Sequence, residues 1–157
     1  MRLTAIKFPG YQSGQTDFAP VFNAAGETER EQLLGVVERI ADQIIQQDSN
    51  QFTSIIVTGH SDRQDRTDFS CDQRRASEIA AARDRAISAW EFVKARVTER
   101  LARSGINGGD WWDSSPRVTW AMVFAAAGML DHDPPASEAE RLANRKVVIL
   151  VSMFTCG

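Results

Sequence analysis

Residues 55–62, IIVTGHSD, decide how this chain divides into strands and helices. The β-branched apolar residues at 55–57 predict a strand. A glycine follows, and then His60, Ser61 and Asp62 stand together where the strand should end. This polar triplet is compatible with a metal site, a catalytic base, part of a ligand clamp, or a strand end that faces water.

The segments before this triplet predict a strand, a helix and a second strand. Phe52–Thr58 is apolar with little alternation, which predicts a strand in the middle of a sheet that is buried on both faces. From Thr28 on, apolar residues recur at helical spacing, and Thr28 with Glu31 forms a capping box, so we expect an amphipathic helix that ends before Asp48. Residues 1–26 predict a first strand followed by a long irregular loop.

The segments after the triplet continue the alternation of helices and strands. The expected elements are a charged loop at 63–73, a long helix from Ser70 or Ser77 to Ser104, a strand at 117–124, a short helix at 137–144 with a capping box of Ser137 and Glu140, and a strand at 146–154. This order predicts an α/β (α+β) two-layer sandwich, in which helices pack on one sheet. We expect a single domain over 1–157, with its core at 27–152.

Composition narrows the class of protein. The chain has 157 residues and a net charge of −3 with a pI near 5.4, so one domain is expected and a nucleic-acid partner is not. The longest apolar run is too short to span a bilayer, and the start MRLTAIKFPG lacks the apolar segment of a signal peptide. These features predict a cytoplasmic protein or a soluble piece of a longer exported chain.

A metal-dependent hydrolase is one hypothesis for the polar residues. His60, Asp62 and His132 could bind zinc or iron if they converged in space, and His132 lies between two further aspartates. Their spacing favours another interpretation, in which His60 is a structural residue at a strand end and His132 is exposed in a loop. No phosphate-binding loop or paired nucleophile is apparent, so we expect neither a cofactor nor catalysis.

The cysteines and tryptophans leave alternatives open. Cys71 and Cys156 fit one disulfide or two inert thiols. Trp111 and Trp112 could stack on a partner or pack back on the core. Together with Trp120 they are candidate anchors of a homodimer.

Asp62 and the arginines of the following helix form the remaining constellation. In a β-turn-α unit the end of the strand faces the start of the helix, so Asp62 is expected near Arg75, Arg83 or Arg85. An arginine binds a carboxylate through two hydrogen bonds and an aspartate binds an ammonium group, so such a pair can hold a small zwitterion. Alternatively, Asp62 and one arginine pair with each other across the loop.

Three ordered motifs resemble those of the OmpA-like (OmpA/MotB C-terminal) peptidoglycan-binding domain. They are Gly59-His60-Ser61-Asp62 in place of G-H-T-D, Arg85-Ala86 in place of the helix R-A, and Asn144-Arg145-Lys146-Val147 in place of N-R-R-V. The resemblance covers about residues 28–151. It implies a βαβαβ(α)β fold with a mixed sheet.

The resemblance also implies a function. Members of this family bind the diaminopimelate residue of the peptidoglycan stem peptide without catalysis, and Asp62 and Arg85 are expected to grip its free amino-acid head. Asn144 and Arg145 are expected to shape the pocket. The further candidates are Arg83, Arg75 and His60. The protein is then expected in the periplasm or cell envelope, where it anchors a larger outer-membrane or stator-like protein and reaches the membrane only through a parent segment.

The sequence also departs from the family pattern. The segment 63–84 is longer than usual, Ala81-Ala82 replaces Leu-Ser, and Glu78 is nearest to the usual asparagine. Arg75-Ala76 offers a second register for the helix motif. An alternative hypothesis is therefore an OmpA-like scaffold that has lost wall binding and serves as a protein-interaction or dimerisation module.

Overall fold

The strands form one mixed sheet. The computed structural model describes residues 2–46, 50–127 and 130–156. The described residues form a four-stranded sheet in the order β1-β4-β2-β3, with β1 at Arg2–Pro9, β4 at Lys146–Thr155, β2 at Gln51–His60 and β3 at Val118–Ala125. The β1–β4 and β2–β4 pairs are antiparallel and the β2–β3 pair is parallel. The predicted mixed sheet is therefore confirmed.

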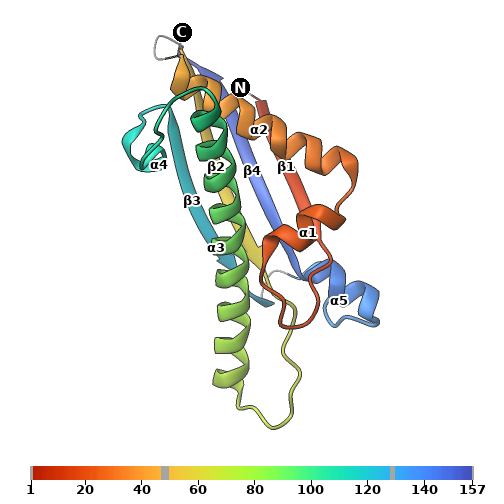
Figure 1. Ribbon diagram of the computed structural model, residues 1–157. Coiled ribbons are helices and arrows are strands. Elements are labelled where there is room, and N and C mark those ends of the chain that lie inside the picture. Colours follow the sequence, from red (N-terminus) through yellow and green to blue (C-terminus); the bar gives the residue numbers. More distant parts are fainter. Residues whose placement is uncertain (1, 47–49, 128–129, 157) are drawn as a thin grey trace.

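The main helices pack on one face of this sheet (Figure 1). The described helices are α1 at Phe18–Ala24, α2 at Glu27–Ile45, α3 at Cys71–Arg103, α4 at Trp111–Ser114 and α5 at Glu138–Asn144. The longest, α3, runs along β2 and β3, as expected for the crossover between two parallel strands. The predicted α+β arrangement of helices on a sheet is confirmed. Within the described residues, no helix combines the length and apolarity that crossing a bilayer requires.

The core lies between the sheet and α1, α2 and α3. Ile55 and Val57 of β2 are fully buried and belong to the same apolar cluster as Leu33, Ile40 and Trp90 of the helices. The intervening Ile56 points to the other face of the sheet and is 37% exposed. The prediction of a central strand is confirmed, but burial on both of its faces is wrong, because the alternate residues lie on the face away from these helices.

Residues 1–26 contain a helix that the sequence did not predict. Phe18 and Phe22 of α1 are buried, and the Phe18 ring lies 5.0 Å from Phe8 and 5.1 Å from Phe92. Pro20 argued against a helix, but it stands in the first turn, where the backbone N–H has no helical acceptor. The predicted irregular loop is therefore shorter than expected.

The start of α2 also differs from the prediction. The helix begins at Glu27 after Gly26, with no side-chain cap. The predicted capping box of Thr28 and Glu31 is wrong, because Thr28 already lies inside the helix. At α5, Ser137 is confirmed as the N-cap, since its hydroxyl accepts from the Glu140 N–H.

The start of α3 decides between the two predicted positions. Ser70 is the N-cap: its Oγ accepts from the Gln73 N–H at 3.2 Å, and Gln73 Oε1 accepts from the Ser70 N–H at 2.8 Å. Ser77 lies one to two turns inside the helix. The predicted insertion at 63–84 is therefore a loop only as far as Ser70 and helical from Cys71.

We expect Ser70→Ala to lower the free energy of unfolding by about 1 kcal/mol, because the first turn of α3 loses a side-chain acceptor. Urea denaturation followed by circular dichroism measures this change. Ser77→Ala is the matched control and should be nearly neutral, since Ser77 caps no helix. An equal loss in both variants would contradict the assigned cap.

The cysteines and tryptophans contradict two of the open alternatives. Cys71 and Cys156 are both free and exposed, so the disulfide is not formed. Trp111 is 1% exposed and donates its indole N–H to Thr98 Oγ1, which removes it as a partner anchor. Trp112 and Trp120 are partly buried against the core as well. A role of Trp112 and Trp120 as anchors of a homodimer stays a prediction.

Candidate functional site

A polar pocket of about 450 Å³ lies where β2 ends. The loop at 61–70, the first half of α3, α5 and the turn at Ser13–Gly14 surround it. Residues 63–66 of the predicted insertion line it directly. The charged side chains in its lining are Asp62, Arg63, Asp65, Arg66, Glu78, Arg85, Arg141 and Arg145.

Close packing of α3 on β2 positions one wall of this pocket. Gly59 lies against the helix backbone, and a Cβ placed there would come within 1.9 Å of the Ala82 carbonyl oxygen. This contact fixes α3 directly over the end of the strand. Arg85, one turn further along α3, therefore reaches the strand end.

Arg85 is buried, and no carboxylate of the described residues lies close enough to form an ion pair with it, although the charge of Asp62 acts on its pKa from a greater distance. Its Nε donates to the Gln15 carbonyl oxygen and its Nη1 to the His60 carbonyl oxygen, both at 2.9 Å, and its guanidinium lies 5.0 Å from the Tyr11 ring centre. The side chain is 2% exposed and lines the pocket. Burial lowers the pKa of Arg85 to about 10, so the group still carries its charge at neutral pH. It is therefore available to an anion.

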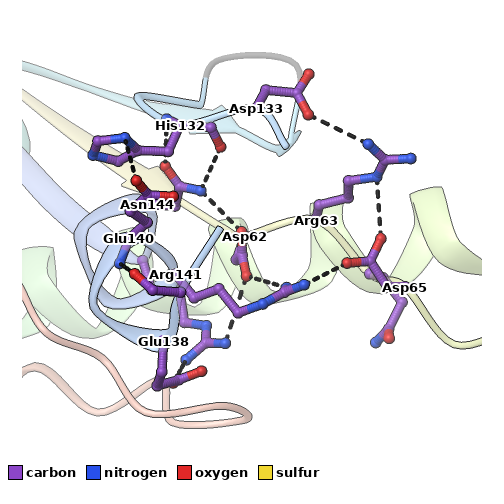
Figure 2. A network of polar contacts seen from close by, with 12 residues as sticks. Asp62, Arg63, Asp65, His132, Asp133, Glu138, Glu140, Arg141 and Asn144 are labelled. Carbon is purple, nitrogen blue, oxygen red and sulfur yellow. Dashed lines mark hydrogen bonds and ion pairs between the residues drawn. The ribbon is translucent and has the colours of Figure 1, made fainter. Parts of the chain in front are cut away.

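Asp62 has an almost complete set of partners. Its Oδ1 accepts from Asn144 Nδ2 at 3.0 Å, and its Oδ2 accepts from Arg141 Nη1 at 2.7 Å (Figure 2). Arg145 Nη2 lies 3.5 Å from the same oxygen. The alternative that Asp62 pairs across the loop with an arginine of α3 is wrong, because its arginine partners are Arg141 and Arg145.

Arg141 is the functional candidate that sequence reasoning missed. Its side chain reaches from α5 to both carboxylates in Figure 2, with Nη2 2.6 Å from Asp65 Oδ2. The hydrogen bonds that Arg141 donates to Asp65 and Asp62 raise the pKa of Arg141. One signal was available: Arg141 stands three residues before Asn144, so both lie on the same face of a helix.

Asn144 and Arg145, which the resemblance implied would shape the pocket, both lie against Asp62, but they do so in different ways. Asn144 is 1% exposed and brackets His132, donating to its carbonyl oxygen at 2.9 Å and accepting from its N–H at 3.0 Å. It holds Asp62 from behind and does not line the pocket. Arg145 lines the pocket and also donates to Glu138 at 2.9 Å.

The remaining candidates lie apart from this cluster. Arg83 is exposed and pairs with Asp84 at 3.0 Å, and Arg75 is exposed and lies 3.4 Å from Glu78. Neither lines the pocket, so of the three candidate arginines on α3 only Arg85 lines the same pocket as Asp62. His60 contributes its backbone oxygen to Arg85.

The predicted metal ligands do not converge. The His132 ring lies beside Glu140, with Nδ1 3.8 Å from Oε1. Across the part of the chain that the structure describes, no three histidine, cysteine, aspartate or glutamate side chains are grouped so that they could hold a metal ion. His60, Asp62 and His132 therefore do not form a common ligand set.

Comparisons with known proteins give matches only among solved structures. No family model and no curated protein matches the chain. The cell wall anchor of the type VI secretion system (T6SS) from Pseudomonas aeruginosa matches 98% of this chain and 82% of its own, at 18% identity and a TM-score of 0.41. The peptidoglycan-associated lipoprotein from Burkholderia pseudomallei matches 94% and 89%, at 11% identity and a TM-score of 0.42.

A third match is the periplasmic domain of Helicobacter pylori MotB (residues 97–256 of that protein), over 99% of this chain and 83% of its own, at 20% identity and a TM-score of 0.37. These structures are of the kind that the three sequence motifs resemble. At such identities the likeness concerns the fold alone. What the pocket does must be argued from its own residues.

Proposed function

We propose that this chain is a non-catalytic module that binds peptidoglycan through the diaminopimelate residue of the stem peptide. One observation carries the proposal: a buried Arg85 without a carboxylate partner among the described residues lines the same pocket as the carboxylate of Asp62. A free amino-acid head carries a carboxylate and an ammonium group. The first suits Arg85 and the second suits Asp62.

The biological role follows from the same proposal. The sequence motifs resemble a wall-binding family, and the solved structures that match include a cell wall anchor and a peptidoglycan-associated lipoprotein. We therefore propose that the chain acts in the periplasm or cell envelope and holds a larger protein against the cell wall. Asn144 and Arg145 support the site by holding Asp62 in place.

Isothermal titration with two muropeptides tests the ligand. The protein should bind a muropeptide that carries diaminopimelate and discriminate against one that carries lysine, because lysine keeps the ammonium group and lacks the carboxylate that Arg85 would bind. Equal binding of both muropeptides would contradict the assigned role of Arg85. If neither muropeptide binds, the better hypothesis is an OmpA-like scaffold that has lost wall binding.

Arg85→Met should weaken binding of the diaminopimelate muropeptide about 100-fold, since it removes a charge-assisted hydrogen bond from a buried site. Arg83→Met is the matched control. It removes the same group two residues away on α3, where the side chain is exposed and pairs with Asp84. Its affinity should stay near that of the wild type, and an equal loss in both variants would show a general effect of charge.

A further inference from the structure

The two charged groups of the proposed site, Arg85 and Asp62, differ in whether they are already paired with an opposite charge within the protein. The anion-binding end is open, because Arg85 uses Nε and Nη1 on backbone carbonyl oxygens and no carboxylate pairs with it among the described residues. The cation-binding end is filled, because Asp62 already accepts from Asn144 and Arg141 and lies 3.5 Å from Arg145. A zwitterionic ligand therefore finds Arg85 without an ion-pair partner, whereas Asp62 is already paired with Arg141.

Asp62 has little room for a further donor. A carboxylate offers about four lone-pair positions, and three nitrogen atoms already lie around this one. The Asp62 side chain is only 5% exposed. One position stays open on a carboxylate that is almost fully buried, so an incoming ammonium group gains full contact with Asp62 only where one of the three donors gives way.

Arg141 is the donor that can leave. Asn144 is 1% exposed and is fixed by two further bonds to His132, and the Arg145 side chain is 8% exposed and is held by Glu138. The Arg141 side chain is 28% exposed, and its other partner is Asp65, which is 45% exposed on the loop at 61–70. A guanidinium at this position regains hydration when it moves into water, and this offsets part of the ion pairing that it gives up.

We propose that Arg141 is an internal occupant of the ammonium-binding end of the site, which the ligand's ammonium group must displace from Asp62 in order to gain full contact with this carboxylate. This inference rests on the proposed function. It makes Arg141 a determinant of specificity: while Arg141 stays on Asp62, a ligand gains from its carboxylate and little from its ammonium group. Displacement removes the Arg141 contact between α5 and the loop at 61–70, while Asn144 stays on Asp62 and Arg63 stays beside Asp65.

Titration with two small ligands tests this inference. The probes are meso-diaminopimelate and pimelate, which has the same carbon chain and both carboxylates but no ammonium group. We expect Arg141→Gln to bind diaminopimelate about tenfold tighter than the wild type and to leave pimelate binding unchanged, because only the former needs Asp62. Equal gains for both probes would contradict the inference.

Arg66→Gln is the matched control. Arg66 also lines the pocket, but it pairs with Asp68 and not with Asp62. The control removes the same charge and so measures the general electrostatic effect, and it should not alter the preference between the two probes. A gain in Arg66→Gln equal to that in Arg141→Gln would overturn the inference.

A structure of the wild type with bound diaminopimelate gives a second readout that does not depend on the stability of a variant. Arg141 should then lie outside hydrogen-bond distance of Asp62 Oδ2, and its persistence there would overturn the inference while the proposed function stood. If only Arg141→Gln binds, the inference holds and the wild type is self-blocked. If neither protein binds, the proposed function and the competition both fail.

Discussion

Asp62→Ala is expected to abolish binding of the diaminopimelate muropeptide and to lower the free energy of unfolding by about 3 kcal/mol. The binding loss follows because no other carboxylate holds the position between Asn144 and Arg145. The stability loss follows because the variant leaves the guanidinium of Arg145 buried beside Arg141 without the carboxylate that faces both. Titration calorimetry and urea denaturation measure the two effects separately.

Two further variants test whether the negative charge of Asp62, and not only the volume of its side chain, is needed for binding. Asp62→Asn keeps the volume of the side chain, so it should keep more stability than Asp62→Ala while it still loses binding. Asp68→Ala removes a carboxylate from the same loop, where the side chain is exposed and pairs with Arg66 at 2.5 Å, and it should change neither quantity appreciably. Wild-type binding by Asp62→Asn would contradict a role for the negative charge.

The sequence predicted the parts of the site that depend on local patterns. The polar triplet at the end of β2 and the helix motif around Arg85 lie within 25 residues of each other, and the crossover from β2 to α3 brings them together. The placement of Asp62 and Arg85 in one pocket follows from this local geometry. The choice of Arg85 over Arg75 agrees with the structure, since only Arg85 is buried there.

The parts that failed depend on contacts between distant segments. One of the two carbonyl oxygens that fix Arg85 belongs to Gln15, 70 residues away, in the predicted irregular loop. Arg141 reaches Asp62 across 79 residues, and its position three residues before Asn144 is the one sequence signal noted above for this contact. Local pattern can therefore propose which groups a site contains, but tertiary packing decides which of them are already paired.

The missing Cβ of Gly59 allows α3 to pack closely on β2, and this packing sets the geometry of the site. We expect Gly59→Ala to lower the free energy of unfolding by about 3 kcal/mol or more, because the added Cβ would lie 1.9 Å from the Ala82 carbonyl oxygen and 2.8 Å from the Ala86 nitrogen. Both atoms belong to the backbone of α3, so no change of side-chain rotamer can relieve the overlap. The helix must move away from β2 or the variant must unfold.

Movement of α3 or unfolding should also disturb the pocket, since Arg85 lies on the segment of α3 that would shift. The affinity for the muropeptide should therefore fall together with the free energy of unfolding. Gly35→Ala is the matched control: it stands inside α2, where the nearest atom to an added Cβ is Arg39 Nη2 at 3.7 Å, and it should stabilise the protein by about 0.5–1 kcal/mol. Urea denaturation of both variants should therefore give shifts of opposite sign. A wild-type midpoint for Gly59→Ala would mean that α3 does not approach the strand this closely, and the position of Arg85 over the strand end would lose its structural basis.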